Sequence, residues 1–164
     1  MTTKTALRTT RIDLPAEKRE VLVTILNARL AETTDYALSL KQAHWNVKGR
    51  QFVAIHEMLD PMFDETVGWA DMMAERAVIL GGQAYGTLQS AAKATSLPAF
   101  PVEATSVADL LGALAASLGK LGAAVRRAID EATGLGDADT ADLFTEVSRG
   151  LDKQLWYFEA HLAD

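Results

Sequence analysis

The sequence has 164 residues, of which 49% are hydrophobic and 23% are charged, so it can form one domain with a sizeable core. It contains no cysteine, which excludes disulfides and thiolate metal sites, so any metal ion must be held by His, Asp or Glu. The net charge of −6 argues against a surface that is basic throughout and against strong unaided binding to nucleic acid.

Residues 1–14 are predicted to be a short flexible tail, and residues 15–164 are predicted to form the folded domain. The tail has no apolar core of the kind that a signal peptide needs. The most apolar stretch of the chain, residues 110–119, is about half as long as a membrane span requires. We therefore expect a cytoplasmic protein that has no membrane partner.

Two long helices are predicted in the first half of the chain, because apolar residues recur there at helical spacing. The first extends from about Pro15 to Asn46. The second extends from about Phe52 to Leu80, ends at the pair of glycines 81–82, and contains Pro61 as an anomaly.

The second half of the chain predicts two further long helices after a crossover, residues 83–104, which is expected to hold one short helix near residues 88–93. The third long helix begins near Thr105 or Ser106 and reaches about Ala132, and the fourth begins at Asp137. No pattern indicates a strand. Two short connections and one long crossover between helices two and three are typical of an all-α, ferritin-like four-helix bundle.

Five potential metal ligands gather on the first two helices: His44, His56, Asp60, Asp71 and Glu75. At about 100° per residue, the four on the second helix share one flank, about 60–160° from the centre of its apolar stripe. His56 and Asp60 are one turn apart, as are Asp71 and Glu75, so each pair can reach one ion. The alternative interpretation of His44, taken singly, is a core residue. For each of the three acids, taken singly, it is an ordinary solvated side chain.

The spacing along the second helix separates the two pairs. They lie roughly 16–22 Å apart at 1.5 Å per residue, too far for one ion whose bonds are about 2.0–2.2 Å long. An antiparallel second copy would place the first pair of one chain beside the second pair of the other. The spacing therefore predicts a two-fold dimer with two identical, shared metal sites.

The segment KQAHWNVKGRQFVAIHEMLDPMFDETVGWADMMAERAVILGG, Lys41 to Gly82, resembles the signature of the Dps family, the DNA-binding proteins from starved cells. The patterns H-W-N, V-x-I-H-E-M-L-D and D-x-M-A-E-R carry this resemblance, and it extends into residues 139–162. The resemblance implies a ferroxidase centre whose ligands come from two subunits, with His44, His56 and Asp60 from one and Asp71 and Glu75 from its two-fold mate.

The same resemblance implies a function. Ferrous iron would be oxidised, preferably by hydrogen peroxide, and stored as ferric mineral in a hollow shell of twelve subunits, which protects the cell and its DNA from oxidative stress. Trp45 matches a family tryptophan that intercepts oxidising equivalents, and its alternative is a packing role. Zinc could substitute for iron. The di-iron site of larger ferritins is excluded, because no Glu is followed three residues later by His.

Two further features depend on the resemblance. Three acids at the start of the fourth helix match those that line an iron-entry pore in the family: Asp137, Asp142 and Glu146. The alternative is that Asp137 caps the helix and that the other two acids favour its positive end. The basic groups of the tail are the candidate DNA contacts: Lys4, Arg8 and Arg11. Family members that condense DNA carry longer, lysine-rich tails, so DNA binding is expected to be weak or absent. The rival hypotheses are a DNA-compacting nucleoid protein with secondary iron binding and a bundle that stores zinc.

Overall fold

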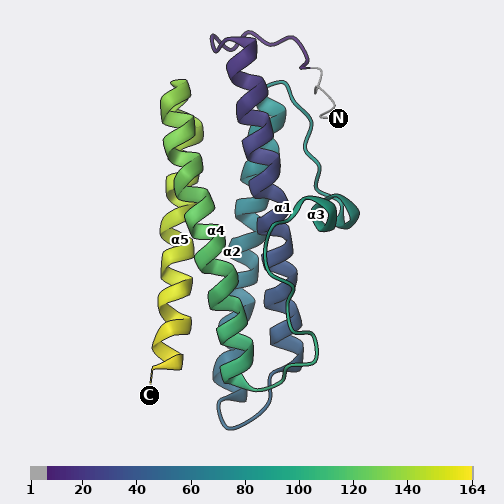
Figure 1. Ribbon diagram of the computed structural model, residues 1–164, viewed down its shortest axis with the longest axis vertical. Helices are drawn as coiled ribbons and strands as arrows, with labels where there is room; N and C mark the ends of the chain where they lie inside the picture. The colour runs from purple at the N-terminus through teal and green to yellow at the C-terminus, as the bar shows by residue number, and fades with distance from the viewer. Residues whose placement is uncertain (1–6, 164) are drawn as a thin grey trace.

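The computed structural model of the protein describes residues 7–163, which form an all-α bundle. Four long helices run side by side, and one short helix lies outside them in the crossover (Figure 1). The helices are α1 (Ala16–Asn46), α2 (Phe52–Ile79), α3 (Leu88–Ala94), α4 (Val107–Leu135) and α5 (Ala138–Leu162). The predicted fold class is therefore confirmed, including the short helix in the crossover.

The helix ends follow the local chemistry of the sequence. Ser106 caps α4, because its side chain accepts a hydrogen bond from the backbone N–H of Asp109. The same helix continues past its predicted end at Ala132, because the left-handed residue that stops it is Gly136, with φ +80°. The helix α2 continues through Pro61 without ending there.

The core forms where the α1–α2 pair packs against the α4–α5 pair. Its largest fully buried side chains include Tyr36, Phe144 and Phe158. Gly150 lets α5 approach α2, because a Cβ atom at that position would lie 2.1 Å from Cζ2 of Trp69. The bundle therefore depends on a close contact between these two helices as well as on its apolar stripes.

The helix α4 is long and apolar enough to cross a membrane by length and composition alone. Its large apolar side chains are nevertheless buried in the bundle: Leu110, Leu111, Leu114, Leu118, Leu121 and Val125. Its apolarity is therefore explained by its position against α1 and α5.

A chain of hydrogen bonds, in which Tyr36 and Gln154 are buried and Glu65 is exposed, links three of the long helices. The Tyr36 hydroxyl of α1 donates to Oε1 of Gln154 on α5 at 2.9 Å, and Nε2 of Gln154 donates to the Glu65 carboxylate of α2 at 2.9 Å. Burial, and next the charge of Glu65, raise the pKa of Tyr36 well above its ordinary value. Tyr36 therefore stays neutral and acts as a hydrogen-bond donor that fixes the register of the helices.

Candidate metal centre

Two histidines meet where the end of α1 lies beside the start of α2. The rings of His44 and His56 stack, with centroids 3.7 Å apart and an interplanar angle of 19°. Nδ1 of each ring lies within hydrogen-bonding distance of the backbone carbonyl of the other, at 2.8 and 2.9 Å. A carbonyl can only accept, so each Nδ1 carries the proton and each Nε2 has a lone pair available for a metal ion.

Asp60 lies one turn beyond His56 and belongs to the same cluster. Its Oδ1 is 3.3 Å from Nδ1 of His44, and it also accepts a hydrogen bond from the Lys41 ammonium. That hydrogen bond is the main cause of the lowered pKa of Asp60; the charges of the neighbouring basic groups add to it, and desolvation opposes it. The carboxylate is therefore ionised at neutral pH and has a cation beside it.

Lys41 is a further residue of this site, one that the ligand pattern of the sequence did not include. Its ammonium is held between the Asp60 carboxylate and the ring of Phe63, whose centroid lies 4.9 Å away. The signal was present in the sequence, because Lys41 precedes His44 by three residues and so lies on the same helical face. A metal ion that binds Asp60 must compete with this ammonium.

Asp71 and Glu75 lie farther along α2, and both are exposed. Because α2 is continuous, the two ligand pairs stay roughly 16–22 Å apart along the helix. Within residues 7–163 no group of three or more His, Asp or Glu side chains converges on one metal position. His44, His56 and Asp60 are neighbours that do not by themselves form a complete metal site, and Asp71 and Glu75 lie apart from them.

The flank that carries these ligands also exposes apolar side chains. Val67 and Val78 are 44% and 43% exposed, and Ile79 is 46% exposed. A hollow of about 400 Å³ lies at this end of α2, and Glu75 lines it together with Val78 and Ile79. Trp45, beside His44 in the sequence, is 67% exposed, so it does not pack into the core of its own chain. Metal ligands and uncovered apolar residues therefore share one surface.

The three acids predicted to line a pore have different environments. Asp137 is buried and caps α5: it accepts from the backbone and hydroxyl of Thr140 and pairs with Arg76 at 2.7 and 3.0 Å. Burial raises its pKa, but the hydrogen bonds from Thr140 and Arg76 outweigh burial and lower it. Asp142 and Glu146 are exposed on the next turns. Asp137 therefore caps a helix, as its alternative interpretation predicted. Only Asp142 and Glu146 are free to face a pore.

The candidate DNA contacts are only partly described. Lys4 lies outside the described residues. Arg8 is exposed but tied to the end of α2, since its backbone N–H donates to the Gly81 carbonyl at 2.8 Å and its guanidinium donates to the Val78 carbonyl at 3.0 Å. Arg11 is exposed. The described tail therefore offers few cations to a phosphate backbone.

The fold and the histidine–carboxylate cluster define a ferritin-like four-helix protein, and the comparisons agree. The model of a family described as the ferritin-like domain matches residues 23–164. The DNA protection during starvation protein of Agrobacterium fabrum is 44% identical over 94% of this chain and 96% of its own length. DpsC from Streptomyces coelicolor superposes with a TM-score of 0.94 at 28% identity, covering 100% of this chain and 96% of its own. A Dps structure from Mycobacterium smegmatis gives 0.92 at 31% identity, covering 96% of each chain.

These relatives match almost the whole chain at both the sequence and the structural level. The protein therefore belongs to the Dps branch of the ferritin-like family.

Proposed function

We propose that the protein is a mini-ferritin ferroxidase: it oxidises ferrous iron at centres shared by two chains and stores the ferric product inside a hollow assembly of twelve subunits. The observation that carries this proposal is the orientation of His44 and His56. Both rings have Nδ1 bonded to a backbone carbonyl, so both have Nε2 available for a metal ion, and the ionised Asp60 lies in the same cluster, with Oδ1 3.3 Å from Nδ1 of His44.

The second half of the ligand set is supplied by a partner chain. Asp71 and Glu75 are too far along α2 to reach the histidines of their own chain, and they lie on a flank with exposed valines and an apolar hollow. Burying this flank against an antiparallel copy covers the apolar surface. It also places the two acids of each chain opposite the two histidines of the other.

The ligand set suits the reaction. Imidazole nitrogens bind ferrous iron, while carboxylates stabilise the harder ferric product. Two ferrous ions together supply the two electrons that reduce one hydrogen peroxide to two waters, with two protons taken up from solvent. Pairwise oxidation consumes both reagents that would otherwise form hydroxyl radicals. Trp45, which is exposed and follows His44 in the sequence, would intercept an oxidising equivalent that escapes.

Complementation between two inactive variants tests the shared centre. One chain carries His44→Ala and His56→Ala, and the other carries Asp71→Ala and Glu75→Ala. After the two are refolded together, half of the two-fold interfaces are mixed and each mixed interface has one complete centre. Co-assembled protein should then regain roughly a quarter of the wild-type ferroxidase centres.

Two controls make this result decisive. Co-assembly is confirmed by isolating particles that hold both variants through two different affinity tags. Each variant refolded alone should stay inactive and should still form a particle far heavier than the 17.7 kDa chain. Proven co-assembly without recovered ferrous oxidation would contradict a shared centre, because a site within one chain cannot be rescued by mixing.

A further inference from the structure

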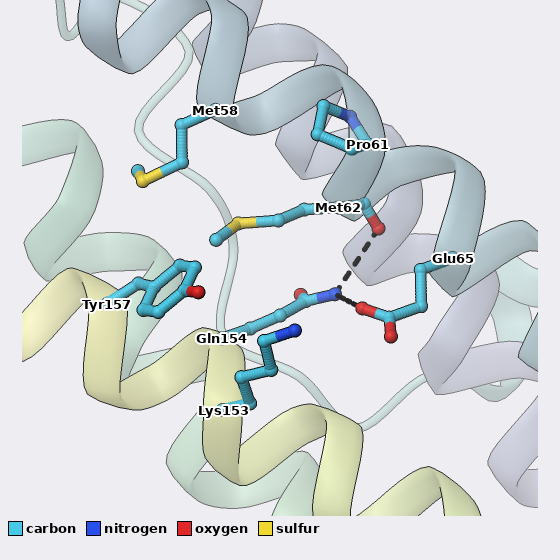
Figure 2. A pocket seen from close by; sticks show the side chains of 7 residues that line it. All are labelled: Met58, Pro61, Met62, Glu65, Lys153, Gln154 and Tyr157. Atoms are coloured by element: carbon cyan, nitrogen blue, oxygen red, sulfur yellow. Dashed lines mark hydrogen bonds between the residues drawn. The ribbon is translucent and has the colours of Figure 1, made fainter.

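A cleft between α2 and α5 contains two thioether sulfurs. It has a volume of about 460 Å³, and Met58, Met62 and Tyr157 line it together with Glu65 and Lys153. Figure 2 shows both methionine side chains reaching from α2 over the same part of the cleft, toward the ring of Tyr157 on α5. The two sulfurs are one helical turn apart in the sequence, so they can reach one ion.

Thioethers are soft ligands, and they favour soft monovalent cations such as copper(I) over ferrous, ferric or zinc ions. Methionine has three rotatable bonds, so both sulfurs can close on an ion without any movement of the two helices. The chain has no cysteine, so thioether sulfur is the softest ligand that it offers. The chemistry of this cleft is therefore different from that of the histidine–carboxylate cluster.

The charges around the cleft also favour a cation. The face of an aromatic ring attracts cations, and the Tyr157 ring already has the Lys153 ammonium 5.9 Å from its centroid. Glu65 brings a carboxylate to the same cleft, where it accepts a hydrogen bond from Gln154. Lys153 is the one like charge that opposes a metal cation among the residues that line this cleft.

The cleft lies on a different face of α2 from the proposed iron ligands. Met58 is about 200° around the helix from both His56 and Asp60, at 100° per residue. An ion held by Met58 and Met62 therefore occupies a second site that does not depend on the ferroxidase centre.

We propose that this cleft binds one soft monovalent cation of the copper(I) class per chain, with the sulfurs of Met58 and Met62 as its ligands and Tyr157 and Glu65 beside it. The probe is silver(I), which has the same preference for sulfur and does not change its oxidation state in air. The assembled protein is labelled with ¹³C in the methionine methyl groups, and silver nitrate is added in chloride-free buffer.

The methyl signals of Met58 and Met62 should move together and saturate at one equivalent per chain, while those of Met72 and Met73 stay in place. Single Met→Leu variants assign the signals. Adding zinc, which is diamagnetic like silver(I), should not reproduce these shifts. Signals that do not move with silver, or that move equally with zinc, would overturn the proposal, as would a shift confined to one of the two methionines.

Two variants give an independent measurement. Met58→Leu with Met62→Leu keeps the apolar volume and should lose one equivalent of bound silver per chain, whereas Met72→Leu, a matched control on the same helix, should lose none. Lys153→Gln removes the opposing charge and should tighten silver binding by about two- to fivefold. A double leucine variant that keeps the full silver stoichiometry would show that the two sulfurs are packing groups only.

Discussion

The two ends of the ligand flank on α2 differ in how much of a metal site a single chain can build. At the end near α1, two histidines orient each other through backbone carbonyls, and Asp60 is ionised beside them. At the other end, Asp71 and Glu75 are exposed acids. The first half is organised by the α1–α2 contact inside the chain, while the second half, in the proposed shared centre, would be organised by another chain.

This difference has a consequence for assembly if the proposed shared centre forms. Exposed acids do not disturb the folding of the single chain, because water solvates them. The prearranged histidines lose little side-chain freedom when an ion arrives. Metal binding and dimer formation should therefore support each other, since each supplies what the other half of the site lacks.

The largest expected effect comes from removing either half of the centre. Two double variants test this: His44→Ala with His56→Ala, and separately Asp71→Asn with Glu75→Gln. Each should weaken zinc binding by at least about 100-fold, because the loss of a direct ligand costs more affinity than the 10–100-fold that is typical when a residue supporting a ligand is removed. Calorimetric titration of the assembled protein measures this. Asp130→Asn with Glu131→Gln, exposed acids on α4, is the matched control and should bind zinc normally.

The same two variants should differ in stability. The histidine variant loses two hydrogen bonds that join α1 to α2, which costs about 2 kcal/mol and lowers Tm by about 4–8 °C. The acid variant should keep its metal-free Tm within about 1 °C, because exposed substitutions have small effects. Equal losses of Tm in metal-free protein at matched concentration would contradict the contrast between the two halves.

Replacing Lys41 should strengthen the organised half. Lys41→Gln removes the ammonium that competes for Asp60, so zinc affinity at pH 7 should rise by about tenfold. Without that ammonium the pKa of Asp60 rises toward its ordinary value, so the affinity of the variant should begin to fall at a higher pH than in the wild type. Lys18→Gln on the same helix is the control. Weaker binding by Lys41→Gln at pH 7 would show that Lys41 positions the carboxylate instead.

The acids at the start of α5 provide a similar contrast with a smaller effect. Asp137→Ala removes the cap of α5 and should lower Tm by several degrees, since a lost cap costs about 1 kcal/mol and Arg76 also loses its hydrogen bonds to Asp137. The lowered pKa of Asp137 means that its contribution is present above the ordinary carboxyl pKa and is lost as pH falls through the folded value. The Tm difference should therefore shrink at strongly acidic pH.

Asp142→Asn with Glu146→Gln should instead leave Tm unchanged and slow iron uptake several-fold, because the acids predicted to line an entry pore would concentrate cations there. Stopped-flow absorbance after ferrous addition measures the uptake. Normal uptake would assign both residues to the favourable charge at a helix start.

The smallest expected effect is on DNA. A protein with a net charge of −6 and three basic tail residues should not retard plasmid at about 150 mM salt, and Arg8→Gln should change nothing there. Retardation that persists at that salt concentration would support the DNA-compacting alternative.

The sequence by itself determined the helices and indicated the ligands of the proposed centre. Periodic apolar residues and glycine and serine signals placed the helix ends within a few residues, since these depend on local backbone preferences. The ligand pairs could be found because residues one turn apart must share a face. Asp137 and Lys41 were harder, because their partners Arg76 and Asp60 lie far away in the sequence.

Only the tertiary structure decided which atoms of the cluster are available. The packing of α1 against α2 sets the two carbonyl contacts that leave Nε2 of His44 and His56 free for a metal ion, and no local pattern encodes a contact across twelve residues and a turn. It also buried Asp137 as a cap while leaving Asp142 and Glu146 exposed. Spacing along one helix gives direction and distance, but proton positions and burial depend on the neighbouring helices.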